Sequence, residues 1–113
     1  MSKNLQARQG DLLFERITPA AFAKQKGGTN KPYESHVFAH GEVTGHMHAM
    51  KPTDLSNVDM YVDTEGHIFI SSTKEIEITH DEHGTVTLPP GEYCMTRQRE
   101  YDWATEQTRK VAD

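Results

Sequence analysis

The sequence is poor in cysteine and in long apolar runs, and both shortages limit what the chain can be. A single cysteine, Cys94, excludes an internal disulfide and is typical of a reducing compartment. No apolar run approaches the ~20 residues of a membrane helix, and no signal-like apolar segment follows Met1. We therefore expect a soluble cytoplasmic protein with no membrane partner.

Positive charge is also scarce. Twelve Lys and Arg against 17 Asp and Glu give a formal net charge of −5, which argues against nucleic acid as a partner. There is no CxxC pair, no phosphate-cradling glycine loop and no Ser-His-Asp or nucleophilic cysteine motif. Apolar residues form 35% of the 113 residues, which suffices for one modest core and one domain.

Short runs of alternating apolar and polar residues, separated by turn residues, predict an all-β fold. We expect a small single-domain barrel or sandwich of about seven or eight strands, with at most one short helix at residues 19–26. A flexible N-terminal arm (1–9) and a polar C-terminal tail (104–113) should flank it. The expected strands are 37–40, 46–50, 58–63, 67–71, 75–79, 85–88 and 92–103.

The same alternation of apolar and polar residues predicts which side chains form the core. Every second residue of a strand faces the same way, so the apolar members of each run should lie on one face. A shift of register by one residue would turn that face to solvent. The residues expected in the core include Val43, Met47, Ile68, Ile70, Ile76, Ile78, Val86, Leu88 and Trp103.

Histidines are concentrated in one stretch, HVFAHGEVTGHMHAM, at residues 36–50. If this stretch is one extended strand, four of the seven histidines and Glu42 share a face, and small apolar residues occupy the other. The glycines within it could instead divide it into two shorter strands. In either case His46 and His48 should project to the same side, close enough to share one ion.

A metal site is one interpretation of these histidines. Neutral imidazole is the commonest metal-binding side chain, and the pair His46 and His48, joined by His80 and His83 of the HDEHG loop, is a typical ligand set. Glu42 could add an oxygen ligand. The expected cofactor of such a site is zinc, iron, nickel or manganese. The alternative is that these residues are only polar members of a sheet face and a turn.

A metal-free catalytic site is a second interpretation. The run 92–103 places Arg97 and Arg99 on one face with two aromatic residues, a set that could hold a phosphate and stack a base. His46 and His48 as general acid and base, with Arg97 or Arg99 stabilising the charged transition state, would suit phosphodiester cleavage. We favour the simpler interpretation of the arginines, which is cross-strand pairing with acidic residues.

Two segments resemble the motifs of the cupin family. GEVTGHMH (41–48) is similar to the first motif, in which a glycine precedes an HxH metal pair on a barrel strand. GTVTLPPGEYC (84–94) is similar to the second motif, with Cys94 where the third histidine recurs. The resemblance implies a barrel with inward-facing histidines.

Over most of its length the chain resembles small uncharacterised proteins of bacteria and their phages, a resemblance that implies no established activity. The leading interpretation is a histidine-rich protein that binds a metal or a small ligand, with or without catalysis. The alternatives are a protein-interaction module of phage or bacterial origin and a His/Arg phosphodiesterase or nuclease-like enzyme. The expected partner is a small ligand or a protein, and a homodimer is left open. The segments that carry the resemblance are RQGDLLF (8–14), AHGEVTGHMH (39–48), THDEHGTVTLPPGEY (79–93) and RQREYDWA (97–104).

Overall fold

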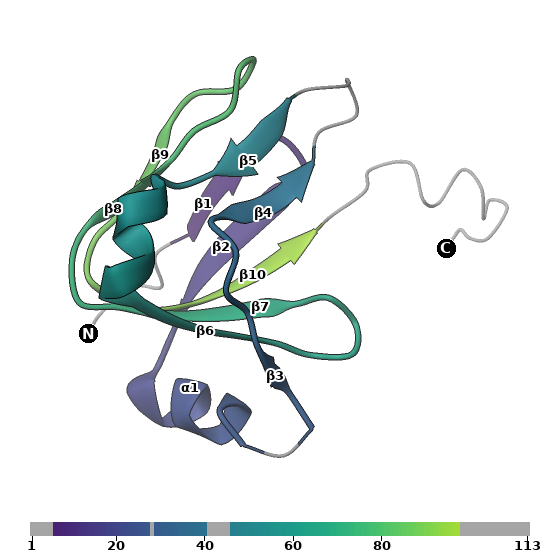
Figure 1. Ribbon diagram of the computed structural model, residues 1–113, viewed down its shortest axis with the longest axis vertical. Coiled ribbons are helices and arrows are strands. Elements are labelled where there is room, and N and C mark those ends of the chain that lie inside the picture. The colour runs from purple at the N-terminus through teal and green to yellow at the C-terminus, as the bar shows by residue number, and fades with distance from the viewer. Residues whose placement is uncertain (1–5, 28, 41–45, 98–113) are drawn as a thin grey trace, which may run out of the picture.

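A computed structural model describes residues 6–27, 29–40 and 46–97 of the chain (Figure 1). These residues form ten strands, one α-helix and one 3₁₀ helix, so the expected all-β fold is confirmed. The strands outnumber the seven or eight expected. Within the described residues they form one large sheet and two small ones without closing into a barrel.

The large sheet has six strands, in the order β1-β2-β10-β7-β6-β3, and every neighbouring pair is antiparallel. The turn at Glu65-Gly66 connects two of its strands, with Gly66 at a φ of +89° that favours glycine. Its members are β1 (Gln6–Gln9), β2 (Leu12–Ile17), β3 (Lys31–Pro32), β6 (Val58–Val62), β7 (Ile68–Ser72) and β10 (Gly91–Arg97).

Two antiparallel hairpins lie over one face of this sheet (Figure 1). Paired backbone hydrogen bonds between Ala49 and Thr79, with N···O distances of 3.1 and 2.8 Å, join one hairpin to the other. The two hairpins therefore act as a second layer, which makes the molecule a sandwich. They consist of β4 (Val37–His40) with β5 (Met47–Ala49), and of β8 (Ile76–Ile78) with β9 (Val86–Leu88).

The core fills the space between the two layers. Phe14 of the large sheet meets Phe38 of the first hairpin edge-to-face, with ring centroids 5.7 Å apart. Among the expected core residues, Met47 is wrong because it is 39% exposed, and Val43 and Trp103 lie outside the described residues. The expected core residues that are confirmed as buried are Ile68, Ile70, Ile76, Ile78, Val86 and Leu88.

Helix α1 (Pro19–Gln25) starts where the sequence predicts. Thr18 Oγ1 accepts a hydrogen bond from the backbone N–H of Ala21 at 3.0 Å, and Pro19 occupies the first turn. The helix packs on the outer face of the large sheet through Phe22, whose ring centroid lies 6.1 Å from that of Tyr61. None of the helices formed by the described residues is long and apolar enough to cross a membrane.

Two expectations are wrong: that the chain has at most one short helix, and that residues 1–9 form a flexible arm throughout. Residues 52–57 form the 3₁₀ helix η1 (Pro52–Asn57), so the described residues contain a second helical element where at most one was expected. Residues 6–9, assigned to a flexible arm, form β1, which pairs with β2 along its whole length. Gln9 is only 2% exposed there, since its side chain has buried hydrogen-bonding partners. The expected tail (104–113) and the part of the expected last strand beyond residue 97 lie outside the described residues.

Candidate functional site

The histidine-rich stretch is a hairpin, so the hypothesis of one continuous strand is wrong and the alternative of two shorter strands is confirmed. The register of β4 and β5 places His40 opposite Met47 and Ala39 opposite His48. Directly opposed residues of an antiparallel pair share a face, so His40 lies with the exposed Met47 and away from His48. Glu42 belongs to the segment between the strands, outside the described residues.

Four imidazoles from two segments that are distant in the sequence come together. His46 and His48 belong to the β5 segment, and His80 and His83 to the loop between β8 and β9. The His80 ring centroid lies 5.7 Å from that of His46, 4.3 Å from that of His48 and 4.6 Å from that of His83. The rings of His48 and His83 are nearly parallel, with centroids 6.1 Å apart. We call these four residues the histidine cluster.

His48 is the buried centre of this cluster, with 2% of its surface exposed. Its Nδ1 lies 2.8 Å from Gln9 Oε1. The Gln9 amide nitrogen donates to two backbone carbonyls, those of Ile78 and Gly84, at 2.8 Å each. An amide nitrogen only donates, so the Gln9 oxygen must face the ring and Nδ1 of His48 must carry the proton. The lone pair of a neutral His48 is therefore on Nε2.

The environment of His48 also keeps the ring neutral. Burial, and after it the neighbouring His80, lower the pKa of His48 from 6.5 to about 4. At neutral pH His48 is thus a neutral imidazole, and its Nε2 can accept a proton, a hydrogen bond or a metal ion. Because this environment disfavours the charged imidazolium form, the His48 ring stays neutral.

Asp11 and Arg97 form the charged side of the site. Arg97 Nε donates to Asp11 Oδ2 at 2.7 Å, and an Arg97 terminal nitrogen donates to the carbonyl of His40 at 2.9 Å. Asp11 Oδ1 lies 3.9 Å from His48 Nε2. Burial alone would raise the pKa of Asp11, but the hydrogen bond and charge of Arg97 outweigh it and hold that pKa below 3.8. Arg97 thus pairs with an acidic residue, as the favoured interpretation has it, and Arg99 lies outside the described residues.

Gly10 lets the turn between β1 and β2 pass close beneath the imidazoles. Its φ of +60° is in the left-handed region that favours glycine. A Cβ at this position would lie 2.9 Å from His83 Nε2 and 3.2 Å from His48 Cε1. Both rings therefore approach the same point, which a side chain on residue 10 would fill.

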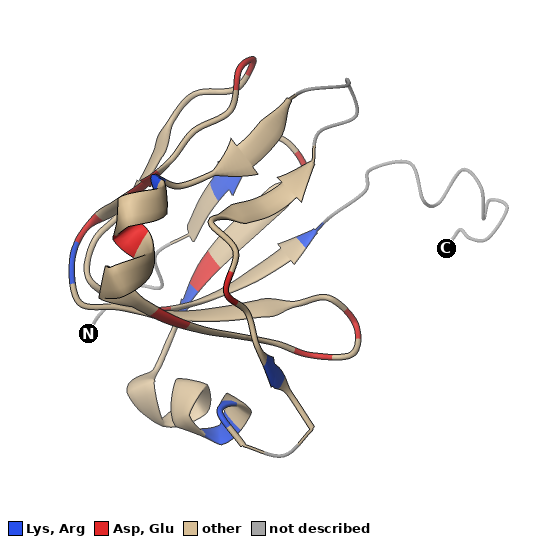
Figure 2. Ribbon diagram, in the orientation of Figure 1, with Lys and Arg blue, Asp and Glu red and all other residues tan. Residues whose placement is uncertain are grey.

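The outer part of the site is acidic, since Asp81 and Glu82 form the red tip of the β8–β9 loop in Figure 2. His46 Nε2 lies 3.6 Å from Asp81 Oδ2, and His46 Nδ1 lies 3.7 Å from Glu82 Oε2. Among the residues that the structure describes, the buried His46 Nδ1 finds no hydrogen-bonding partner. His80 Nδ1 accepts the backbone N–H of Glu82 at 3.0 Å, so a neutral His80 carries its proton on Nε2.

The described side chains do not form a finished metal site. Across residues 6–27, 29–40 and 46–97, no three His, Cys, Asp or Glu side chains are placed to hold a metal ion as they stand. Cys94 does not join the cluster: it lies between Tyr93 and Met95 on β10 and faces the opposite side from these two core residues. Burial raises the pKa of Cys94 to about 11, which keeps the thiol protonated.

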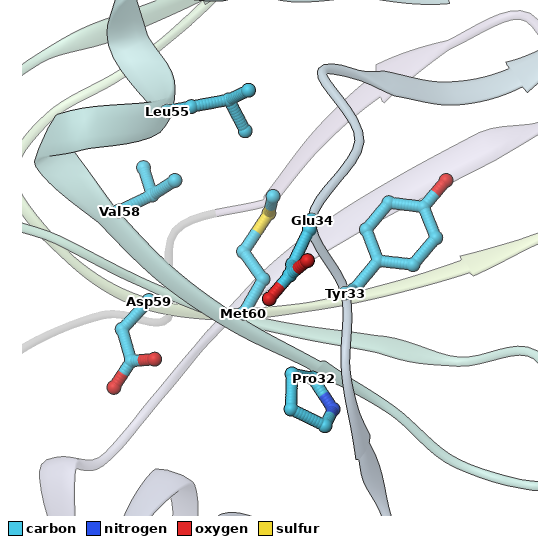
Figure 3. A pocket seen from close by; sticks show the side chains of 7 residues that line it. All are labelled: Pro32, Tyr33, Glu34, Leu55, Val58, Asp59 and Met60. Atoms are coloured by element: carbon cyan, nitrogen blue, oxygen red, sulfur yellow. The ribbon is translucent and has the colours of Figure 1, made fainter.

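Gln9, Gly10 and Asp11 were missed as site residues by sequence reasoning. The only local signal is the Gly-Asp pair, which indicates a turn and no chemistry. A separate open hollow of about 370 Å³ lies between η1, β6 and the segment after β3 (Figure 3), and it shares no residue with the histidine cluster. Its lining residues are Pro32, Tyr33, Glu34, Leu55, Val58, Asp59 and Met60.

Comparison with known proteins places the domain in a family. No solved structure matches the chain. An endoglucanase of Bacillus sp. (strain KSM-635) is 42% identical over 74 residues, which cover 57% of this chain and 8% of that enzyme. The chain therefore spans only a small part of that relative's length. A family model matches residues 8–98, which include Gln9, Asp11, Arg97 and the whole histidine cluster, and the chain belongs to this family, described as a domain of unknown function (DUF8820).

Proposed function

We propose that the histidine cluster binds a divalent transition-metal ion, with His48 as the central ligand. The observation that carries this proposal is the hydrogen bond between Gln9 and His48, which leaves a neutral buried ring with its free lone pair on Nε2. Metal-binding histidines almost always donate their other ring N–H to an oxygen acceptor, which fixes the tautomer and the orientation of the ring. Gln9 Oε1 supplies that acceptor.

The spacing of the rings supports the same proposal. A ring nitrogen ~2.0 Å from a zinc ion puts the ring centroid ~3.2 Å from the ion, so two such rings at a tetrahedral angle have centroids ~5 Å apart. The His48 centroid lies 6.1 Å from that of His83. Because the loop that carries His83 is exposed, rotation of its side chains changes this distance without moving the core.

The charge around the cluster favours a cation. Carboxylate oxygens of Asp11, Asp81 and Glu82 lie 3.6–3.9 Å from imidazole nitrogens. The low pKa of His48 prevents this ring from supplying the compensating positive charge itself. A dication would interact favourably with neutral rings and carboxylates at once, and zinc, iron, nickel and manganese accept this mixture of ligands.

The proposal is tested by titrating metal-free protein, purified without a histidine tag, with Zn²⁺, Ni²⁺, Mn²⁺ and Fe²⁺. We expect at least one ion to bind stoichiometrically in calorimetry and to raise the melting temperature, since a ligand at 100 times its Kd stabilises by ~2.7 kcal/mol. His48→Gln should weaken binding at least tenfold. His67→Gln is the matched control, because His67 also contacts a carboxylate, Asp63, but lies outside the cluster.

If no ion of the four changes the melting temperature of the wild-type protein, the metal proposal fails. The interaction module and the metal-free phosphodiesterase then become the leading hypotheses, since neither requires a metal. The match to part of an endoglucanase does not carry that enzyme's activity to this chain, because the match covers only 8% of the enzyme.

A further inference from the structure

We infer that Asp11 is an oxygen ligand of the metal, so that the ion is held by His48 Nε2, His83 Nε2 and Asp11 Oδ1 at the turn between β1 and β2. This inference rests on the proposed function and specifies its ligand set. It makes the site a mixed one, with two imidazoles and one carboxylate, which suits zinc, iron(II) or manganese.

Asp11 is within a small movement of the ligand position. Two ligand atoms ~2.1 Å from one metal lie ~3.0–3.4 Å apart for angles between 90° and 110°. Asp11 Oδ1 is 3.9 Å from His48 Nε2, so a shift of ~0.5–0.9 Å would complete the pair. Arg97 binds the other oxygen, Oδ2, and thereby leaves Oδ1 on the side of His48.

His83 is the second nitrogen ligand because of its position against Gly10. His83 Nε2 and His48 Cε1 lie 2.9 and 3.2 Å from one point, the place of the absent Gly10 Cβ. Asp11 is the next residue along this turn, so the carboxylate and both rings meet at the same short segment. His83 is exposed, and its side chain can therefore turn toward the ion at little cost.

His80 is the nearest ring to His48, yet its protonation excludes it from this set. Its Nδ1 accepts the backbone N–H of Glu82, and its Nε2 then carries the proton, so neither nitrogen of the neutral ring has a free lone pair. His46 lies farther out, between Asp81 and Glu82. Because His80 is excluded as a ligand, the Asp11 carboxylate is the third group beside His48 and His83.

The test separates a ligand from a residue that only orders the turn. Asp11→Asn and Arg97→Gln both break the ion pair between Asp11 and Arg97, but only the first removes the carboxylate. We expect Asp11→Asn to weaken metal binding at least tenfold in calorimetry, and Arg97→Gln, which keeps the carboxylate but removes its orienting partner, to weaken it clearly less. Asp59→Asn is the control for a carboxylate away from the cluster, since Asp59 pairs with Lys26, and it should bind like wild type.

Spectroscopy on the unmodified chain gives a second readout that does not depend on a variant that folds. On addition of Zn²⁺, the ¹³C resonance of the Asp11 carboxyl and the ¹⁵N resonances of His48 and His83 should shift together at one equivalent. The inference is overturned if the Asp11 resonance stays in place while that of His48 moves. It is also overturned if Asp11→Asn binds like wild type, or if Arg97→Gln loses as much affinity as Asp11→Asn. Failure of the wild-type protein to bind any metal would instead remove the proposed function, and this inference with it.

Discussion

Gln9 Oε1 and His48 Nδ1 lie 2.8 Å apart, although 39 residues separate them in the chain. Through its nitrogen, the same Gln9 amide binds the carbonyls of Ile78 and Gly84 on either side of the β8–β9 loop. One side chain thus connects the first strand, the central imidazole and both sides of the loop that carries His80 and His83. The geometry of the histidine cluster depends on this amide.

Replacement of Gln9 by leucine should damage both stability and the state of His48. Loss of the amide leaves two carbonyls and Nδ1 of His48 without their partner, and a buried polar group without a partner costs ~1–3 kcal/mol. We expect the free energy of unfolding to fall by roughly 2 kcal/mol or more, and ¹⁵N NMR to show that His48 no longer holds its proton on Nδ1 alone. Gln6→Leu, an exposed change on the same strand, is the control and should alter neither quantity appreciably.

Stability should fall as the solution becomes mildly acidic. The pKa of His48 is about 4 in the folded protein and 6.5 in the reference state, so below pH 6.5 the unfolded chain takes up a proton that the folded protein does not. This contribution is fully present above pH 6.5 and is lost as the pH falls toward 4. At pH 5 the loss is about 2 kcal/mol relative to pH 7.5.

Urea denaturation of metal-free wild type and His48→Gln at pH 7.5 and pH 5 measures that loss. The variant lacks the titrating ring, so its stability should change less between the two pH values, by about 2 kcal/mol. Equal losses in the two proteins would contradict the assignment of a neutral, buried His48. Asp11 contributes little to the change in stability between pH 7.5 and pH 5, because its pKa lies below 3.8.

Gly10→Ala should impair metal binding more than it impairs folding. A Cβ in the left-handed region costs ~1–2 kcal/mol, and here it would also displace His83, whose Nε2 lies 2.9 Å away. Gly66→Ala is a matched control, since Gly66 also has a positive φ but has no neighbour within 4 Å of the added carbon. The two variants should lose similar stability, while only Gly10→Ala should lose affinity for the metal by at least tenfold. A Gly10→Ala protein with wild-type affinity would contradict the position assigned to the ion.

Ile78→Ala tests the core beneath the site. Ile78 is fully buried between the layers, and truncation of such a side chain costs ~2–5 kcal/mol. Glu77→Ala on the same strand faces solvent and should change stability by less than ~0.5 kcal/mol. Chemical denaturation of both variants gives the two values, and a loss below ~0.5 kcal/mol for Ile78→Ala would mean that the strand does not face the core.

Local patterns predicted the strands well. The expected runs 75–79 and 85–88 enclose β8 and β9, because alternation and the turn residues between them are visible in neighbouring positions. His46 and His48, which the same period places on one side, both lie beside His80. By contrast, β1 could not be predicted, since its sequence QARQ lacks alternation. The two carbonyls that the Gln9 side chain binds are 69 and 75 residues away.

The prediction of which face of β5 is buried was also wrong, for a physical reason. The sequence shows histidines on one side of the strand and small apolar residues on the other, and hydrophobicity alone would turn the apolar side inward. In the structure His48 is buried and Met47 is exposed. Gln9 reverses the preference by providing a hydrogen bond for the buried ring, and this contact depends on a segment that local patterns cannot connect to β5.

The long separations in this site also determine when it can form during synthesis. Gln9 leaves the ribosome about 70 residues before the two carbonyls that it binds, so the buried amide of β1 has no partner until β8 and β9 follow. A nascent chain that ends before β9 should therefore be unable to retain a metal ion. Metal capture would then follow the synthesis of the β8–β9 loop, and the ion would connect segments made early and late in translation.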